Sequence, residues 1–155
     1  MSDSAFNQLT PALKHHGGRS LWLADENLLS ANLAAQDNTL VITNRIDLEN
    51  HLQRQGWKVF FSDYDLSIVE DNSLDRVIYR VSKEKPVVHY LINQAFRCLK
   101  ADGQLFLAGD KSEGIKTYFS KAQKLFGSGE CIKADKDTWL ATLNKQNIEF
   151  SNPLD

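Results

Sequence analysis

The fold is decided by the stretch Arg19-Ser-Leu-Trp-Leu-Ala24, followed directly by Asp25-Glu-Asn-Leu-Leu-Ser-Ala-Asn32. The first six residues, which end in the apolar run Leu21-Trp-Leu-Ala24, are predicted to form a buried strand. In an α/β domain that binds a nucleotide, glycine follows the first strand, because the backbone must approach the ligand closely. Residues 25–32 contain no glycine. The architecture therefore looks like that of a nucleotide-binding domain, whereas the pocket looks absent.

Four further apolar runs continue the strand pattern. Each is short, rich in β-branched and aromatic residues, and bounded by polar residues or glycine. The runs are Thr39–Thr43, Lys58–Phe61, Asp75–Tyr79 and Gln104–Ala108. Because polar residues are scarce within them, we expect strands that are buried on both faces.

Helical spacing fills the segments around these strands. Apolar residues recur three or four positions apart in residues 5–13, 28–33, 46–52, 87–99 and 115–126. Pro86 falls in the first turn of the fourth helix, and Gly56 and Gly103 each close a helix, Ala101-Asp-Gly103 having the composition of a left-handed cap. Alternating strands and helices predict an α/β fold whose mostly parallel sheet carries helices on both faces.

The pattern changes after the last helix. Glu130–Ala134 and Thr138–Leu143 read as two strands joined by the short connection Asp135-Lys-Asp137, which predicts an antiparallel hairpin. Gly127-Ser-Gly129 leaves a helix and enters a strand, so it is predicted to be a turn and not a phosphate loop. A parallel sheet that ends in a reversed hairpin is typical of the Rossmann-like class I methyltransferases.

Composition sets the remaining bounds. The chain has 155 residues, enough for one domain, and a formal net charge of −2, which gives no general attraction to nucleic acid. Cys98 and Cys131 have apolar neighbours and are predicted to be inert core thiols in a reducing compartment. Neither a membrane span nor a leader pattern is found, so we expect a cytoplasmic protein.

Four segments carry a resemblance to a known family. They are Val77–Pro86, Gly103–Gly109, Glu113–Lys116 and Cys131–Leu143. With the helix after Pro86, they resemble the N-terminal domain of the ribosomal RNA guanine-N2 methyltransferases of the small-subunit methyltransferase C type, the methyltransferase small domain family. The likeness is close over residues 72–143 and weaker over the first 70.

This resemblance implies a division of labour between two methyltransferase-like domains. In that family the C-terminal domain binds S-adenosylmethionine and catalyses, and the N-terminal domain supports its partner and helps to hold ribosomal RNA. We therefore expect residues 1–143 to be a degenerate, non-catalytic domain, and residues 144–155 to be a tail or linker toward a C-terminal catalytic domain of the same chain. Neither catalytic nor cofactor-binding residues are expected here.

Two missing motifs agree with this expectation. The family's catalytic half carries an Asn-Pro-Pro-Phe type motif after its fourth strand, but that strand here ends in Arg80-Val-Ser82, and Asn152-Pro153 lies in the polar tail. The acid that binds ribose after the second strand is replaced by Asn44-Arg45, with Asp47 a poor substitute. Gly17-Gly18 precede the first strand and read as the cap of the opening helix.

Basic residues are the remaining candidates for a site. Arg80, Lys83 and Lys85 follow the fourth strand, at the edge where open α/β sheets place ligands, and are candidates for an RNA or interdomain contact. The alternative is a solvated loop in which Glu84 is the local partner. Lys111 and Lys116 flank the start of the next helix and would extend an anion site there, although Ser112 as an N-cap explains that segment without any ligand and is the favoured interpretation.

Other chemistries find little support. His15-His16, His51 and His89 lack the spacing of a metal site. Trp22, Trp57 and Trp139 are predicted to pack in the core or between domains. Two alternatives stay open: a free-standing methyltransferase whose Asp25 or Glu26 holds the cofactor, and a pure interaction domain.

Overall fold

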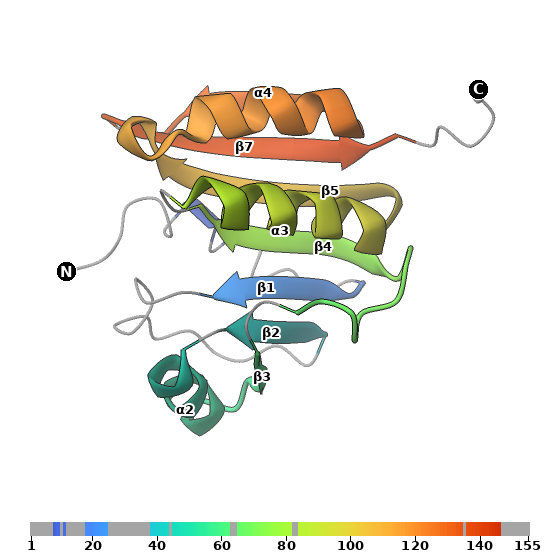
Figure 1. Ribbon diagram of the computed structural model, residues 1–155, viewed down its shortest axis with the longest axis vertical. Helices are drawn as coiled ribbons and strands as arrows, with labels where there is room; N and C mark the ends of the chain where they lie inside the picture. The colour runs from blue at the N-terminus through green and yellow to red at the C-terminus, as the bar shows by residue number, and fades with distance from the viewer. Residues whose placement is uncertain are drawn as a thin grey trace.

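The computed structural model describes residues 8–9, 11, 18–24, 38–43, 45–62, 65–81, 84–134 and 136–146. Figure 1 shows one sheet with its helices packed against it. The elements are β1 (Ser20–Ala24), β2 (Thr39–Thr43), α2 (Ile46–Arg54), β3 (Lys58–Phe61), β4 (Leu74–Arg80), α3 (Lys85–Cys98), β5 (Leu99–Asp110), the 3-10 turn η2 (Lys111–Glu113), α4 (Ile115–Phe126), β6 (Gly127–Lys133) and β7 (Thr138–Lys145).

The seven strands lie in the order β3-β2-β1-β4-β5-β7-β6. The first five run parallel, and β7 is antiparallel to both of its neighbours. The order reverses at β1, which lies between β2 and β4. This arrangement confirms the predicted fold class, a mostly parallel α/β sheet that ends in an antiparallel hairpin.

The larger core lies on the face covered by α3 and α4, which Figure 1 shows in front of the sheet. Apolar residues at helical spacing on both helices meet the inward residues of β1, β4, β5 and β7. Fully buried members include Leu91, Ala95, Leu105, Tyr118 and Phe126. Burial of this stripe explains why these two segments form helices at all, since isolated helices of this length are marginal in water.

The smaller core lies on the opposite face of the sheet and includes α2. Leu48 and Leu52 of that helix pack toward Trp22 and Trp57, whose rings meet edge to face with centroids 5.1 Å apart. Both tryptophans are buried, which confirms the prediction of a packing role for them. Trp139 is half-buried and packs against the larger core.

Strand β3 differs from its prediction. The run Lys58–Phe61 was expected to be buried on both faces, but Phe60 is 52% exposed and Phe61 is 49% exposed. The reason is its position: β3 pairs only with β2 and forms one edge of the sheet. Its apolar residues therefore lack the second neighbour that central strands have.

The turn at residues 101–103 also differs from its prediction as a left-handed glycine cap. The left-handed residue is Asp102, with φ +70°, and not Gly103. Gly103 is needed for space, because a Cβ there would lie 2.8 Å from the carbonyl oxygen of Lys100. The register between β4 and β5 shifts at the same place, between Leu74 and Arg76.

The prediction of a turn at residues 127–129 is partly wrong. Gly127 adopts φ +99° and ends α4, but Ser128 and Gly129 already belong to β6. Residues 25–37, which include the predicted helix at 28–33, lie outside the described residues, as does most of the predicted opening helix. Within the described part of that opening segment, Gln8, Leu9 and Pro11 are helical and Leu9 is buried.

The cysteines match their prediction as inert thiols. Cys98 is buried, Cys131 is half-buried, and neither forms a disulfide. Burial raises the pKa of both thiols, so little thiolate forms at neutral pH. No described helix has the length and apolar character needed to cross a membrane.

Strand β7 extends past Leu143, the predicted end of the domain. Lys145 Nζ donates hydrogen bonds to the carbonyl oxygens of Phe96 at 2.7 Å and Leu99 at 2.8 Å, and to Asn72 Oδ1 at 3.1 Å. Burial lowers the pKa of this amine. Lys145 therefore fastens β7 to the end of α3 and belongs to the folded domain.

Replacing Lys145 is expected to destabilise the domain. Both K145A and K145M should lower the free energy of unfolding by about 2 kcal/mol, since hydrogen bonds from a charged group are lost. Denaturant unfolding measures the change, and K133A on the exposed part of β6 is the control. An effect of K145M equal to that of the control would show that the ammonium contributes nothing.

Candidate functional site

The carboxyl end of β4 is occupied by an ion pair. Arg80 is 5% exposed, and its Nη1 donates to Glu113 Oε1 at 2.7 Å and Glu113 Oε2 at 2.6 Å. The same nitrogen donates to the Val81 carbonyl oxygen at 2.7 Å. The partner of Arg80 is thus Glu113 of η2, 33 residues away, and the guanidinium is directed into the domain. Arg80 is consequently not available for an RNA contact on the surface.

Glu113 also organises the start of α4. Its Oε1 accepts a hydrogen bond from the Asp110 backbone N–H at 2.8 Å, and the two residues form a capping box around η2. Gly114, with φ +91°, then turns the chain into α4. The predicted N-cap at Ser112 is therefore wrong, because Ser112 lies inside η2, whose N-cap is Asp110, and the N-cap of α4 is Gly114.

Beside this ion pair, apolar packing closes the ends of β4 and β5. The Val81 backbone N–H donates to the Ala108 carbonyl oxygen at 2.9 Å, and both residues are fully buried. A Cβ on Gly109 would clash with Val81 Cγ2, so the valine fills the space above this glycine. Val81 and the Arg80–Glu113 pair thus occupy the described end of β4.

The end of β2 does not fit S-adenosylmethionine either. Arg45 donates to Asp47 through Nε at 3.2 Å and Nη2 at 2.8 Å, and its backbone N–H donates to Thr43 Oγ1 at 3.2 Å. The hydrogen bond from Arg45 lowers the pKa of the Asp47 carboxyl group. This carboxylate is therefore engaged by its own neighbour, and a cation stands where a ribose would need an acceptor. The described residues at the ends of β2 and β4 thus do not fit the cofactor.

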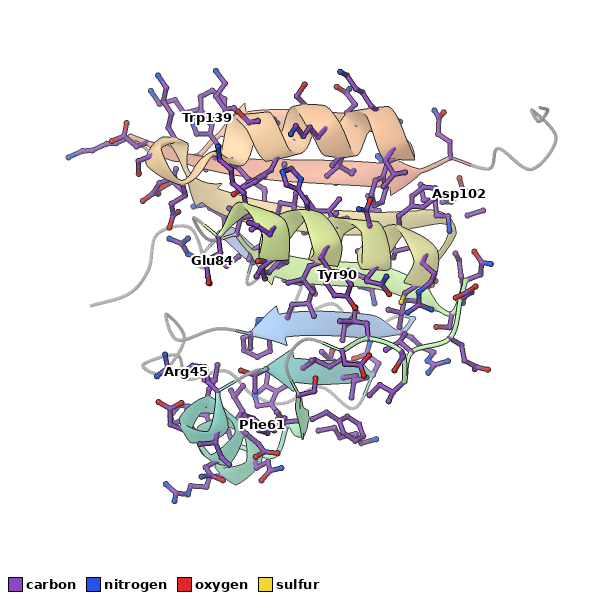
Figure 2. The ribbon with its side chains drawn as sticks, in the orientation of Figure 1. Arg45, Phe61, Glu84, Tyr90, Asp102 and Trp139 are labelled. Carbon is purple, nitrogen blue, oxygen red and sulfur yellow. The ribbon has the colours of Figure 1, made fainter. Side chains whose placement is uncertain are left out.

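A hollow of about 390 Å³ lies beside the closed end of β4, between the first turns of α3 and α4. Three exposed lysines line it: Lys85 at the start of α3, Lys111 in η2 and Lys121 in α4. The hydroxyl-bearing residues Ser112 and Thr117 also line it. Figure 2 shows the adjoining Glu84 at the edge of the sheet where β4 ends.

His89 and Tyr118 form part of the wall of this hollow. Their rings meet edge to face, with centroids 5.4 Å apart. Burial lowers the pKa of His89, and so do the positive charges of Lys121 and Lys85. The pKa of Tyr118 is raised by burial and by Glu113. At neutral pH both rings are uncharged, so the charge in the hollow comes mainly from the lysines.

The four predicted basic residues that the structure describes lie in three separate places. Lys85 and Lys111 come together at the hollow. Lys116 points to another side of α4, where its Nζ lies 4.8 Å from the ring centroid of Trp139. Arg80 is buried on Glu113, and Lys83 lies outside the described residues. The prediction of Lys85 and Lys111 as binding residues stays a prediction, which the geometry neither tests nor removes.

Sequence reasoning missed Lys121, His89 and Tyr118. A local signal existed for part of this set, since Lys85 and His89 are four residues apart, as are Thr117 and Lys121, and such pairs share a helix face. This local spacing could not show that α3 packs beside α4, which brings the face of α3 with Lys85 and the face of α4 with Lys121 together.

Comparison with known proteins gives a family and a fold. The sequence profile of the family described as "Methyltransferase small domain N-terminal" matches residues 19–138. Among characterised relatives, the chain is 32% identical over 96 residues to the ribosomal RNA small subunit methyltransferase C of Shewanella pealeana. That alignment covers 56% of this chain but only 28% of the relative, so this chain spans well under two thirds of the length of that protein.

Solved structures show the same fold. The T. thermophilus 16S rRNA N2 G1207 methyltransferase (RsmC), solved in complex with AdoMet and guanosine, superposes with a TM-score of 0.75 at 22% identity, covering 94% of this chain and 39% of that one. A methyltransferase from Pyrococcus furiosus gives a TM-score of 0.67 at 16% identity, covering 93% of this chain and 82% of that one.

Removing Glu113 is expected to be costly, because it leaves a buried guanidinium without its carboxylate. E113A should lower the free energy of unfolding by about 3 kcal/mol. E130A, on the exposed surface of β6, is the matched control and should cost less than about 0.5 kcal/mol. Denaturant unfolding compares the two variants, and equal costs would show that the pair does not hold η2 in place.

His89 is expected to make stability pH-dependent. Because its pKa is lower in the folded chain than its ordinary value of 6.5, the unfolded chain takes up the proton first as the pH falls. The contribution of neutral His89 to the free energy of unfolding is complete above pH 6.5, and it is lost as the pH falls from there toward the pKa of His89 in the folded chain. Unfolding at several pH values should show this loss in the native protein and a smaller one in H89Q. An unchanged profile in H89Q would refute the assignment.

Proposed function

Because the chain belongs to the methyltransferase small domain N-terminal family, we propose that it is the non-catalytic N-terminal half of an S-adenosylmethionine-dependent ribosomal RNA guanine-N2 methyltransferase. The observation that supports the proposal is the end of β4, which Val81 and the ion pair between Arg80 and Glu113 close, since the resemblance to the family leads us to expect the catalytic motif of the other half after this strand. The proposed location is the cytoplasm.

The proposed partner is a C-terminal catalytic domain of the same chain. The Shewanella relative and the T. thermophilus structure are both much longer than this chain, which matches 28% and 39% of them respectively. In the proposal S-adenosylmethionine belongs to that other half. Residues 1–143 form the supporting domain, whose folded part extends to Lys145, and the remaining residues up to 155 link it to its partner.

A second part of the proposed role is to help hold ribosomal RNA. Lys85 and Lys111 lie on the exposed rim of one hollow, joined there by Lys121. Ammonium groups in such an arrangement suit phosphate oxygens, which position RNA without reading its sequence. Lys83 and Lys116 stay within the proposal as neighbouring contacts, whereas Arg80 acts inside the domain.

The competing function is a free-standing methyltransferase, in which Asp25 or Glu26 would hold the cofactor. It requires a cofactor site that the described residues at the ends of β2 and β4 do not supply. Among those described residues, Asp47 is paired with Arg45, and Val81 closes the end of β4.

Calorimetric titration of the chain with S-adenosylmethionine tests the proposal. We expect no binding heat and no thermal shift, and no methyl transfer to small ribosomal subunits by the chain alone. The complete T. thermophilus methyltransferase is the positive control. Micromolar binding, worth about −8 kcal/mol, would overturn the non-catalytic assignment.

A further inference from the structure

We propose that the hollow between α3 and α4 holds a backbone phosphate of RNA, and that His89 makes this contact stronger as the pH falls. The inference rests on the proposed function, since RNA is the occupant only if the chain supports an RNA-modifying enzyme. The proposal assigns RNA binding to this one hollow and adds regulation of that binding by pH.

The geometry is that of a three-sided cation cluster. Lys85, Lys111 and Lys121 come from α3, η2 and α4, so three separate elements converge on one space of about 390 Å³. Ser112 and Thr117 add hydroxyl donors to its lining. Flexible ammonium groups with hydroxyls suit a phosphate, which offers several oxygen acceptors.

The charges of the hollow are not balanced from within the described part of the chain. There, no carboxylate lies within ion-pairing distance of Lys85, Lys111 or Lys121. Glu113 does line the hollow, but its carboxylate is engaged by Arg80 and by the Asp110 backbone N–H. An anion from outside would therefore relieve the repulsion among the three lysines.

The protonation of His89 depends on the positive charge of Lys121 and Lys85. The charged and titratable groups around it are Lys85 on its own helix, Lys121 and Tyr118 on α4, and Lys111 and Glu113 on η2. Burial and the lysines disfavour its protonated form in the free protein. A bound phosphate would reverse the sign of the local field, so binding and protonation of His89 should assist each other.

The first experiment measures binding of a polyuridine RNA of about ten nucleotides, a length typical of single-strand sites. The variant K85A/K111A/K121A is compared with K58A/K124A/K133A, which removes the same charge from exposed positions elsewhere. We expect the first variant to weaken binding at least tenfold and to reduce the salt dependence, and the control to change affinity less than threefold. Thermal unfolding confirms that both variants are folded.

Equal losses in the two triple variants would overturn the assignment, because binding would then follow net charge alone. Binding of a polyglutamate peptide as tight as that of RNA, with the same dependence on the three lysines, would also overturn it, since the hollow would then recognise carboxylate and not phosphate.

The second experiment tests His89. Between about pH 8 and about pH 6 each phosphodiester of RNA keeps one negative charge, so pH effects on RNA binding come from the protein. As the pH falls over this range, we expect the dissociation constant for RNA to fall severalfold in the native protein and to change little in H89Q. Nuclear magnetic resonance of the imidazole should show its pKa rising when RNA is added. A pKa that does not move would overturn the regulatory part.

These outcomes are separate from those of the cofactor titration. If RNA binding ignores the three lysines while S-adenosylmethionine does not bind, the site assignment fails and the supporting role stands. If the chain binds S-adenosylmethionine, the proposed function fails whatever the lysine variants show.

Discussion

The buried guanidinium of Arg80 is the constraint on which the carboxyl edge depends. A charge taken out of water needs a carboxylate and further acceptors, and Glu113 together with the Val81 carbonyl oxygen supplies them. Glu113 reaches Arg80 only when η2 folds back against the end of β4. The ion pair thereby fixes how the chain leaves β5 and where α4 begins, and it sets the position of Lys111 on one side of the turn.

This constraint separates two properties that share one edge in a cofactor-binding sheet. At the described end of β4 a salt bridge and a valine occupy the space. The adjacent space between α3 and α4 is open and has a basic lining. Closing the strand end does not close this charged surface, because the surface depends on the positions of the helices and not on the strand ends.

Much of the fold follows from local patterns in the sequence. The bounds of β2 and β3 were predicted to the residue, because β-branched and aromatic runs end abruptly at polar neighbours, and the alternation of elements gave the parallel sheet with its hairpin. The exposure of β3 was not predicted, since edge position is a property of strand order.

The site could be predicted less well than the fold. Arg80 was predicted to lie on the surface because its partner lies in another element, and the role of Lys145 depends on the contact between α3 and β7. Local sequence does not specify which distant elements touch.

The reversed direction of β7 has a geometric consequence. Figure 1 shows its arrow pointing opposite to those of β4 and β5, so Lys145 lies at the amino edge of the sheet, near the start of β5. The basic hollow lies at the other edge. The chain therefore leaves the described domain at the edge of the sheet opposite the lysines, and a fluorophore attached at Gln146 itself would lie away from the basic hollow.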